Sequence, residues 1–167
     1  LATVIATFGV ISDSTATVIG AMIVAPLMGP IMATAAAVVM GSGRRAFNAL
    51  VLVVIGVASV IALSWLLTFI IPDTAISFQS NAEITSRIQP GLLALLTALA
   101  SGAAGAYITA HAEIADSMGG VAITISLVPP LCVVGISLNE GQLAAALGSF
   151  MLFITNFLAI LLAGGLT

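Results

Sequence analysis

The chain has 167 residues, of which 61% are hydrophobic and 5% are charged, and its mean hydropathy is +1.32. A soluble domain carries about 25% charged residues, so this composition excludes one with an ordinary water-facing surface. Three basic residues cannot form a phosphate-binding face, which excludes nucleic acid as a partner. The sequence therefore predicts an all-α polytopic membrane protein whose first partner is the lipid bilayer.

Charged residues divide the chain into long uncharged runs. A helix needs about 20 residues to cross ~30 Å of hydrocarbon. Every run after the first is long enough to cross once, and the first is short because the chain begins inside an apolar stretch. We expect six transmembrane helices, at residues 1–11, 15–41, 46–71, 89–110, 118–138 and 142–165.

The basic residues orient these helices. Arg44 and Arg45 form the one basic pair of the sequence and mark the loop between the second and third helices as cytoplasmic. Both termini are then cytoplasmic, and the loop at 73–88 lies outside. Within that loop, Glu83 and Arg87 are four residues apart and are expected to form a surface pair.

Two segments of the sequence resemble each other at an offset of 103 residues. Asp13 and Asp116 are each followed by a serine, and prolines follow at Pro26 and Pro129. Three helices per half would insert the second half upside down, a layout found in secondary transporters. The alternative is chance similarity within apolar, alanine-rich sequence. The predicted transmembrane domain covers 1–167, with repeat one at 1–72, an outer loop at 73–88 and repeat two at 89–167.

Prolines interrupt the second and fifth predicted helices near the bilayer centre. Each proline removes a backbone donor and disfavours helical geometry in the preceding residue. Either the helices are kinked and neighbouring groups satisfy the freed carbonyls, or both helices are discontinuous. In the second case, a carbonyl end would favour a cation and an amide end an anion. The residues expected to line a substrate or ion pathway are Ala25, Pro26, Gly29, Pro30, Ser126, Pro129, Pro130 and Asn156.

Few other polar residues are candidates for a functional site. Asn156 lies within the sixth predicted helix, where its carboxamide bonds another helix or contacts a ligand. Asp13 and Asp116 each precede a helix and are expected to be N-caps; with Glu113, they are alternatively sites of ion entry. One histidine and one cysteine cannot form an ordinary zinc site. We expect no enzyme, metal or cofactor, because no nucleophile–base constellation is visible.

The fourth predicted helix carries small residues four apart, Ala98 with Gly102 and Ser101 with Gly105. Such faces let helices approach closely. We expect them to pack helices together, within the chain or between subunits of a homo-oligomer.

Four stretches resemble the bacterial and archaeal membrane proteins known as domain of unknown function 389. They are residues 18–30 (VIGAMIVAPLMGP), 100–106 (ASGAAGA), 127–131 (LVPPL) and 152–157 (LFITNF). The resemblance implies a bacterial or archaeal cell membrane and a cytoplasmic domain that precedes this one in a longer chain. It implies no activity or substrate.

Two functions are compatible with the sequence. The first is a transport protein, either a secondary transporter or an ion channel, for a small solute or ion that passes the mid-membrane breaks. The second is a structural or signalling module that anchors and oligomerises a cytoplasmic domain. The second predicts continuous, kinked helices and subunit contacts through the fourth helix.

Overall fold

The computed structural model describes residues 1–24, 28–71, 78, 80–89, 91–110 and 127–166, and every element in it is a helix. The elements are α1 (Ala2–Ile11), α2 (Thr15–Ile23), α3 (Met28–Val39), α4 (Gly43–Ile70), α5 (Ala82–Ile88), α6 (Leu92–Ala110), α8 (Val128–Asn139) and α9 (Leu143–Leu166). The all-helical prediction is confirmed. The predicted second span consists of two separate helices, α2 and α3.

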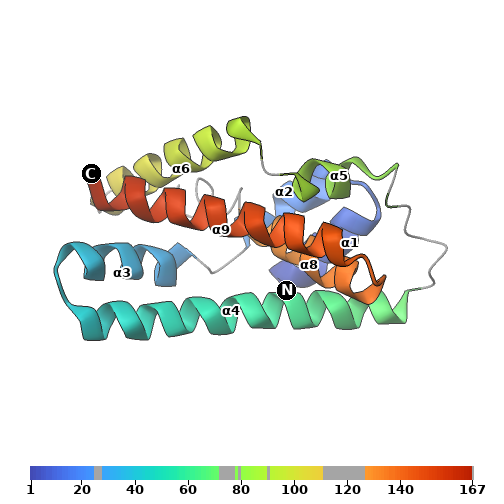
Figure 1. The fold of residues 1–167 in the computed structure, drawn as a ribbon, viewed down its shortest axis with the longest axis horizontal. Helices are drawn as coiled ribbons and strands as arrows, with labels where there is room; N and C mark the ends of the chain where they lie inside the picture. The colour runs from blue at the N-terminus through green and yellow to red at the C-terminus, as the bar shows by residue number, and fades with distance from the viewer. Residues whose placement is uncertain (25–27, 72–77, 79, 90, 111–126, 167) are drawn as a thin grey trace.

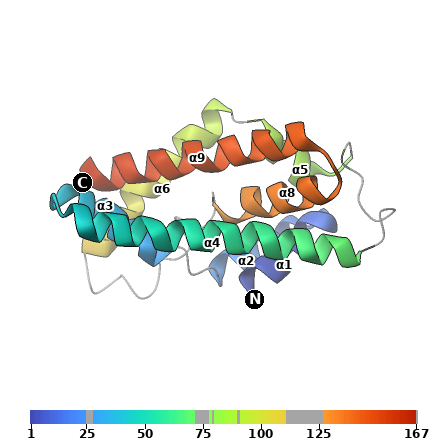
Figure 2. The ribbon, with the colours of Figure 1, turned by 60° about the horizontal axis from the view of Figure 1, so that its bottom comes forward.

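Two long helices, α4 and α9, run along the long axis of the molecule (Figures 1 and 2). At 1.5 Å per residue, they are about 42 and 36 Å long. Within the described residues, they are the two helices long and apolar enough to cross a membrane. Only 17% of the most apolar stretch of α4 is buried. Most of its apolar surface is therefore not covered by the rest of the chain, unlike that of a soluble core helix.

Each long helix forms a hairpin with a short one. α3 and α8 each have 12 residues and lead through a tight turn into α4 and α9. Gly41 and Gly141 adopt φ values of +65° and +69° in these turns, a conformation that glycine adopts without steric cost. The glycine amides donate to Val38 O and Leu138 O, and the next amides, of Ser42 and Gln142, donate to Ala37 O and Ser137 O. Both turns are therefore Schellman C-caps.

The two hairpins match at an offset of 100 residues, not at the offset of 103 residues that relates the two similar segments of the sequence. The start of the short helix, the capping glycine and the start of the long helix all coincide at 100. This register pairs Pro30 with Pro130 rather than Pro26 with Pro129. Proline is favoured in the first turn of a helix, and both Pro30 and Pro130 lie there.

The hairpins point in opposite directions (Figures 1 and 2). The α3–α4 turn lies at the end of the molecule where α9 terminates, and the α8–α9 turn lies at the other end, beside α5. α3 packs on both α4 and α9, and so does α8. The two short helices thus occupy opposite halves of the space between the long ones.

The described charged residues are confined to the two ends of the long axis. One end holds the α1–α2 turn with Asp13, α5 with Glu83 and Arg87, and the α8–α9 turn with Glu140. The other end holds the first turn of α4 with Arg44 and Arg45. Between these ends, the described part of the chain carries no charge.

The region predicted as an outer loop contains a helix, α5. Asn81 is its N-cap and accepts a hydrogen bond from Ile84 N at 2.9 Å. Asn81 Nδ2 also donates to Val10 O at 2.7 Å, which fixes α5 to the end of α1. The bond to Val10 joins residues 71 positions apart, so the sequence pattern alone did not show how α5 is held.

Candidate functional site at the starts of α3 and α8

α8 begins in the interior of the molecule. Every residue from Leu127 to Ser137 is buried, and Leu127, the N-cap, is 0% exposed. A helix start normally leaves four backbone N–H groups without intrahelical partners. Pro129 and Pro130 fill two of those four positions and have no N–H group to satisfy. The proline pair therefore permits a helix to start where water is absent, and it lies in the first turn rather than at a kink.

The carbonyl oxygens of the two equivalent prolines, Pro30 and Pro130, each accept a hydrogen bond from a hydroxyl group. Thr34 Oγ1 donates to Pro30 O at 2.7 Å within α3, and Ser149 Oγ of α9 donates to Pro130 O at 2.9 Å. Thr34 and Ser149 are buried. Sequence reasoning missed both residues, although a small hydroxyl side chain in an apolar helix was a usable signal.

One apolar cluster joins the starts of both short helices. Ile31, the residue after Pro30, is 1% exposed and belongs to the same buried cluster as Val128. Phe153 and Phe157 of α9 complete this part of the cluster, and their rings stack with centroids 5.9 Å apart. The centre of the described structure is therefore closed by apolar side chains.

Asn156 lies on α9 between these two phenylalanines in sequence and is 3% exposed. This placement agrees with the expected burial of its carboxamide inside the protein. By contrast, α2 ends at Ile23, which is 61% exposed. The carbonyl end of α2 is thus not enclosed by the chain, whereas the amide end of α8 is.

Five of the residues predicted for the pathway or for ion entry lie outside the described residues. They are Ala25, Pro26, Glu113, Asp116 and Ser126. Gly29 is in the first turn of α3, next to Pro30.

A buried polar contact joins α1, α4 and α8 near this site. Thr7 Oγ1 and Ser64 Oγ are 2.6 Å apart, and both residues are 0% exposed. The Cys132 thiol lies within hydrogen-bonding reach of both hydroxyls and is itself buried. Thr7 Oγ1 donates to Thr3 O at 2.8 Å, so Ser64 supplies the proton shared with Thr7. These groups satisfy one another and lock three helices together.

Asp13 has a structural role different from the one predicted. Ser14, not Asp13, is the N-cap of α2. Asp13 adopts φ +52° and accepts a hydrogen bond from Glu83 N at 2.9 Å, so its carboxylate caps the first turn of α5. The sequence could not show this because the two residues are 70 positions apart.

Glu83 and Arg87 are not a surface pair. Glu83 is 6% exposed, and its Oε2 lies 2.7 Å from Arg87 Nη1. Glu83 Oε1 accepts a hydrogen bond from Thr15 Oγ1 at 2.6 Å. A sequence pattern shows the spacing of an ion pair but not whether the folded chain buries it.

The small-residue face of α6 packs against α9 within the chain. A Cβ atom built on Gly102 would lie 2.8 Å from Ile160 Cα and 2.9 Å from Ala163 Cβ. Only glycine permits this approach. Ala98, on the same face, is 0% exposed.

Comparisons with known proteins place the chain in a family. A model for the family described as Domain of unknown function (DUF389) matches residues 22–162, so the chain belongs to that family. An uncharacterized protein of Methanocaldococcus jannaschii is 32% identical over 160 residues. That match covers 96% of this chain but 48% of the relative, so the chain spans about half the length of that protein. No solved structure matches the chain.

Proposed function

We propose that this member of the DUF389 family is a membrane transport protein, a secondary transporter or an ion channel, in a bacterial or archaeal cell membrane. Its six spans form two inverted repeats, and a small solute or ion passes between them. The observation that carries the proposal is the pair of half-length helices. α8 begins in the interior, α3 reaches the same buried cluster through Ile31 near its start, and the two helices run to opposite ends of the molecule. Inverted repeats with discontinuous helices are a recognised layout of secondary transporters.

Membrane embedding is supported by the position of the charges. The described charged residues lie at two ends separated by the uncharged lengths of α4 and α9. These helices exceed the ~30 Å of a bilayer core. The end with Arg44 and Arg45 is cytoplasmic, together with both termini, and the end with α5 is external. The uncovered face of α4 meets lipid or another subunit of a homo-oligomer.

The site selects its substrate through the dipoles of two helix ends more than through side chains. α3 and α8 direct their amide ends toward the apolar cluster that contains Ile31 and Val128. Helix N-termini carry partial positive charge, which favours an anion or an electronegative group. Asn156 adds a carboxamide at the same cluster.

The apolar cluster acts as a closed gate in this account. Ile31, Val128, Phe153 and Phe157 fill the space where the repeats meet. Apolar constrictions block ions by excluding water. Opening requires the two hairpins to separate there.

The second candidate function is a module that anchors and oligomerises a cytoplasmic domain. The uncovered face of α4 favours it, since such a face is available to a second subunit. The small-residue face of α6 does not, because α9 already occupies it. Such a module would not carry ions or solutes across the membrane.

Flux measurements on liposomes distinguish the two functions. The purified chain is reconstituted with potassium chloride inside, and chloride release is followed with an electrode after valinomycin is added. Potassium release is followed separately with a proton-sensitive dye and a protonophore. Val128→Thr keeps the side-chain shape but adds a hydroxyl to the gate, and Val133→Thr makes the same change in a different buried cluster of α8.

We expect Val128→Thr to raise ion release well above that of the wild type and of Val133→Thr, with chloride favoured over potassium. The hydroxyl admits water into the constriction, while both variants carry the same burial cost. Release equal to that of protein-free liposomes, for the wild type and both variants, would contradict an ion pathway at this gate and favour the anchoring module.

A further inference from the structure

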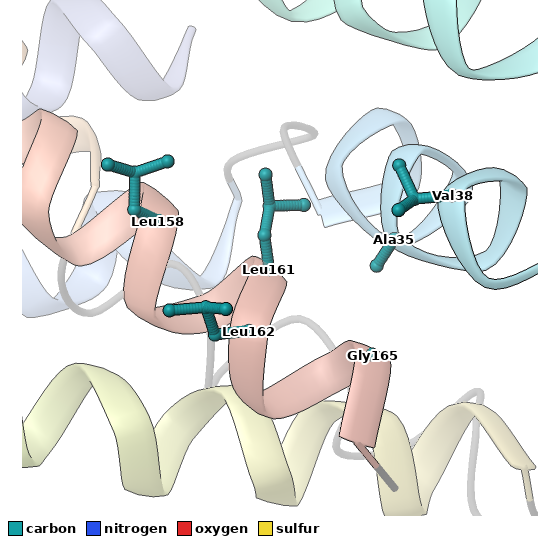
Figure 3. Close-up of a pocket in the computed structure, with 6 residues that line it drawn as sticks. All are labelled: Ala35, Val38, Leu158, Leu161, Leu162 and Gly165. Atoms are coloured by element: carbon teal, nitrogen blue, oxygen red, sulfur yellow. The ribbon is translucent and has the colours of Figure 1, made fainter. Parts of the chain in front are cut away.

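A groove between α3 and α9 is lined wholly by apolar residues and has a volume of about 250 Å³. Figure 3 shows its walls: Ala35 and Val38 of α3, and Leu158, Leu161, Leu162 and Gly165 of α9. The α9 residues recur at intervals of three and four, so they form one stripe about 10 Å long. A lining of this kind accepts hydrocarbon and offers nothing to a polar ligand.

The groove reaches the end of the molecule that carries the basic pair. A Cβ atom on Gly165 would lie 3.6 Å from Val39 Cγ2, so the last turns of α9 and α3 are in contact there. The α3–α4 turn follows directly, and then Arg44 and Arg45, which are both exposed. The described acidic residues are at the opposite end.

The arginines occupy positions that are electrostatically unfavourable without an anion. They lie in the first turn of α4, where the helix dipole is positive and cations are disfavoured. The N-cap, Ser42, makes no side-chain hydrogen bond to the amides of that turn. The equivalent turn of the second hairpin has the same backbone hydrogen bonds but carries Ala144 and Ala145 in place of the arginines. The turn itself therefore does not require arginine.

We propose that the groove and the basic pair together bind one anionic phospholipid. An acyl chain lies between α3 and α9, and the phosphate contacts the guanidinium groups of Arg44 and Arg45 and the free amides of α4. Basic residues on the cytoplasmic side of membrane helices attract anionic lipids in this way. The inference rests on the membrane embedding proposed above, but not on transport.

The test measures lipids retained by the detergent-purified chain in native mass spectrometry. The probes are phosphatidylglycerol and phosphatidylcholine with identical acyl chains, and inorganic phosphate. We expect the wild type to retain phosphatidylglycerol about 30-fold better than phosphatidylcholine, from two charge contacts. The Arg44→Gln/Arg45→Gln variant should lose that preference, and phosphate alone should not be retained.

Two further variants test the groove. Ala35→Leu fills it, whereas Ala36→Leu adds the same atoms on the neighbouring exposed position and serves as the control. Ala35→Leu should reduce retention of both lipids, and Ala36→Leu should not. Leu162→Trp provides a second obstruction at a position that is 64% exposed, in case Ala35→Leu impairs folding.

Equal retention of the two lipids by the wild type would overturn the proposal. So would unchanged retention by both groove-filling variants, since the headgroup would then bind without the groove. Retention of inorganic phosphate alone would assign the arginines to a free anion. Because binding is measured without flux, the lipid site can fail while transport stands, and the reverse.

Discussion

Gly135 determines how closely α8 approaches α4. A Cβ atom at this position would lie 2.6 Å from Ile61 O, 2.6 Å from Ser64 Cβ and 2.9 Å from Trp65 N. Two of these are backbone atoms, which cannot move aside as a flexible side chain can. The close contact between α8 and α4 therefore requires glycine at position 135, although most residues of α8 are apolar with larger side chains.

We expect Gly135→Ala to lower the free energy of unfolding by about 1–3 kcal/mol, the usual range for overpacking a core. Gly20→Ala is the matched control, because a Cβ atom there would meet nothing within 4 Å. Replacing that helical glycine should stabilise the protein by up to ~1 kcal/mol. Thermal unfolding of both purified variants in detergent measures the difference. Equal melting temperatures would contradict the close packing of α8 on α4.

At the scale of elements, α5 is held by apolar packing and by two capping side chains. Ile84 is 0% exposed and lies in a buried cluster with residues of α1, α2 and α8. Asp13 and Asn81 supply acceptors to the first-turn amides of α5, and Asn81 also bonds Val10 O. A seven-residue helix is not stable alone in water. Its order therefore depends on contacts with the rest of the chain, and these hydrogen bonds are part of them.

Replacing Asp13 tests this dependence. Asp13→Ala removes the acceptor and leaves a β-carbon at positive φ, so α5 should lose about 1 kcal/mol of local stability. Asp13→Asn keeps an acceptor and tolerates the left-handed conformation, so it should retain most of that stability. Hydrogen exchange of the amides of residues 82–88 reports the effect. Exchange in Asp13→Ala as slow as in the wild type would show that the carboxylate is not needed.

The sequence predicted the long helices well and the breaks only in part. Uncharged runs placed helices at 46–71 and 142–165, and the structure has α4 at Gly43–Ile70 and α9 at Leu143–Leu166. The prolines indicated that the second and fifth predicted helices are interrupted. They did not indicate that Pro30 and Pro130 lie in the first turns of α3 and α8. The register of 100 residues is set by the two Schellman turns. Each turn requires one glycine, so it adds little to the similarity between the two halves of the sequence.

Candidate site residues were harder to predict, because their partners are remote in sequence. Burial of Asn156 followed from its position in an apolar helix. The contact of Thr7 with Ser64, and the cap that Asp13 gives to α5, each join residues more than 50 positions apart. Such pairs are determined by tertiary packing, which periodicity and composition do not encode.

At the scale of the whole molecule, the account depends on two hairpins that point in opposite directions across a membrane. Ser42 and Gln142 occupy equivalent positions in the two turns. Cysteine substituted at either position, in a Cys132→Ser background that removes the sole native thiol, marks the location of each turn.

The decisive measurement labels these two variants with a membrane-impermeant maleimide in sealed vesicles of known orientation. We expect position 42 to react only from the cytoplasmic side and position 142 only from the external side. Reaction of both positions from the same side would contradict the inverted architecture and, with it, the proposed pathway between the repeats.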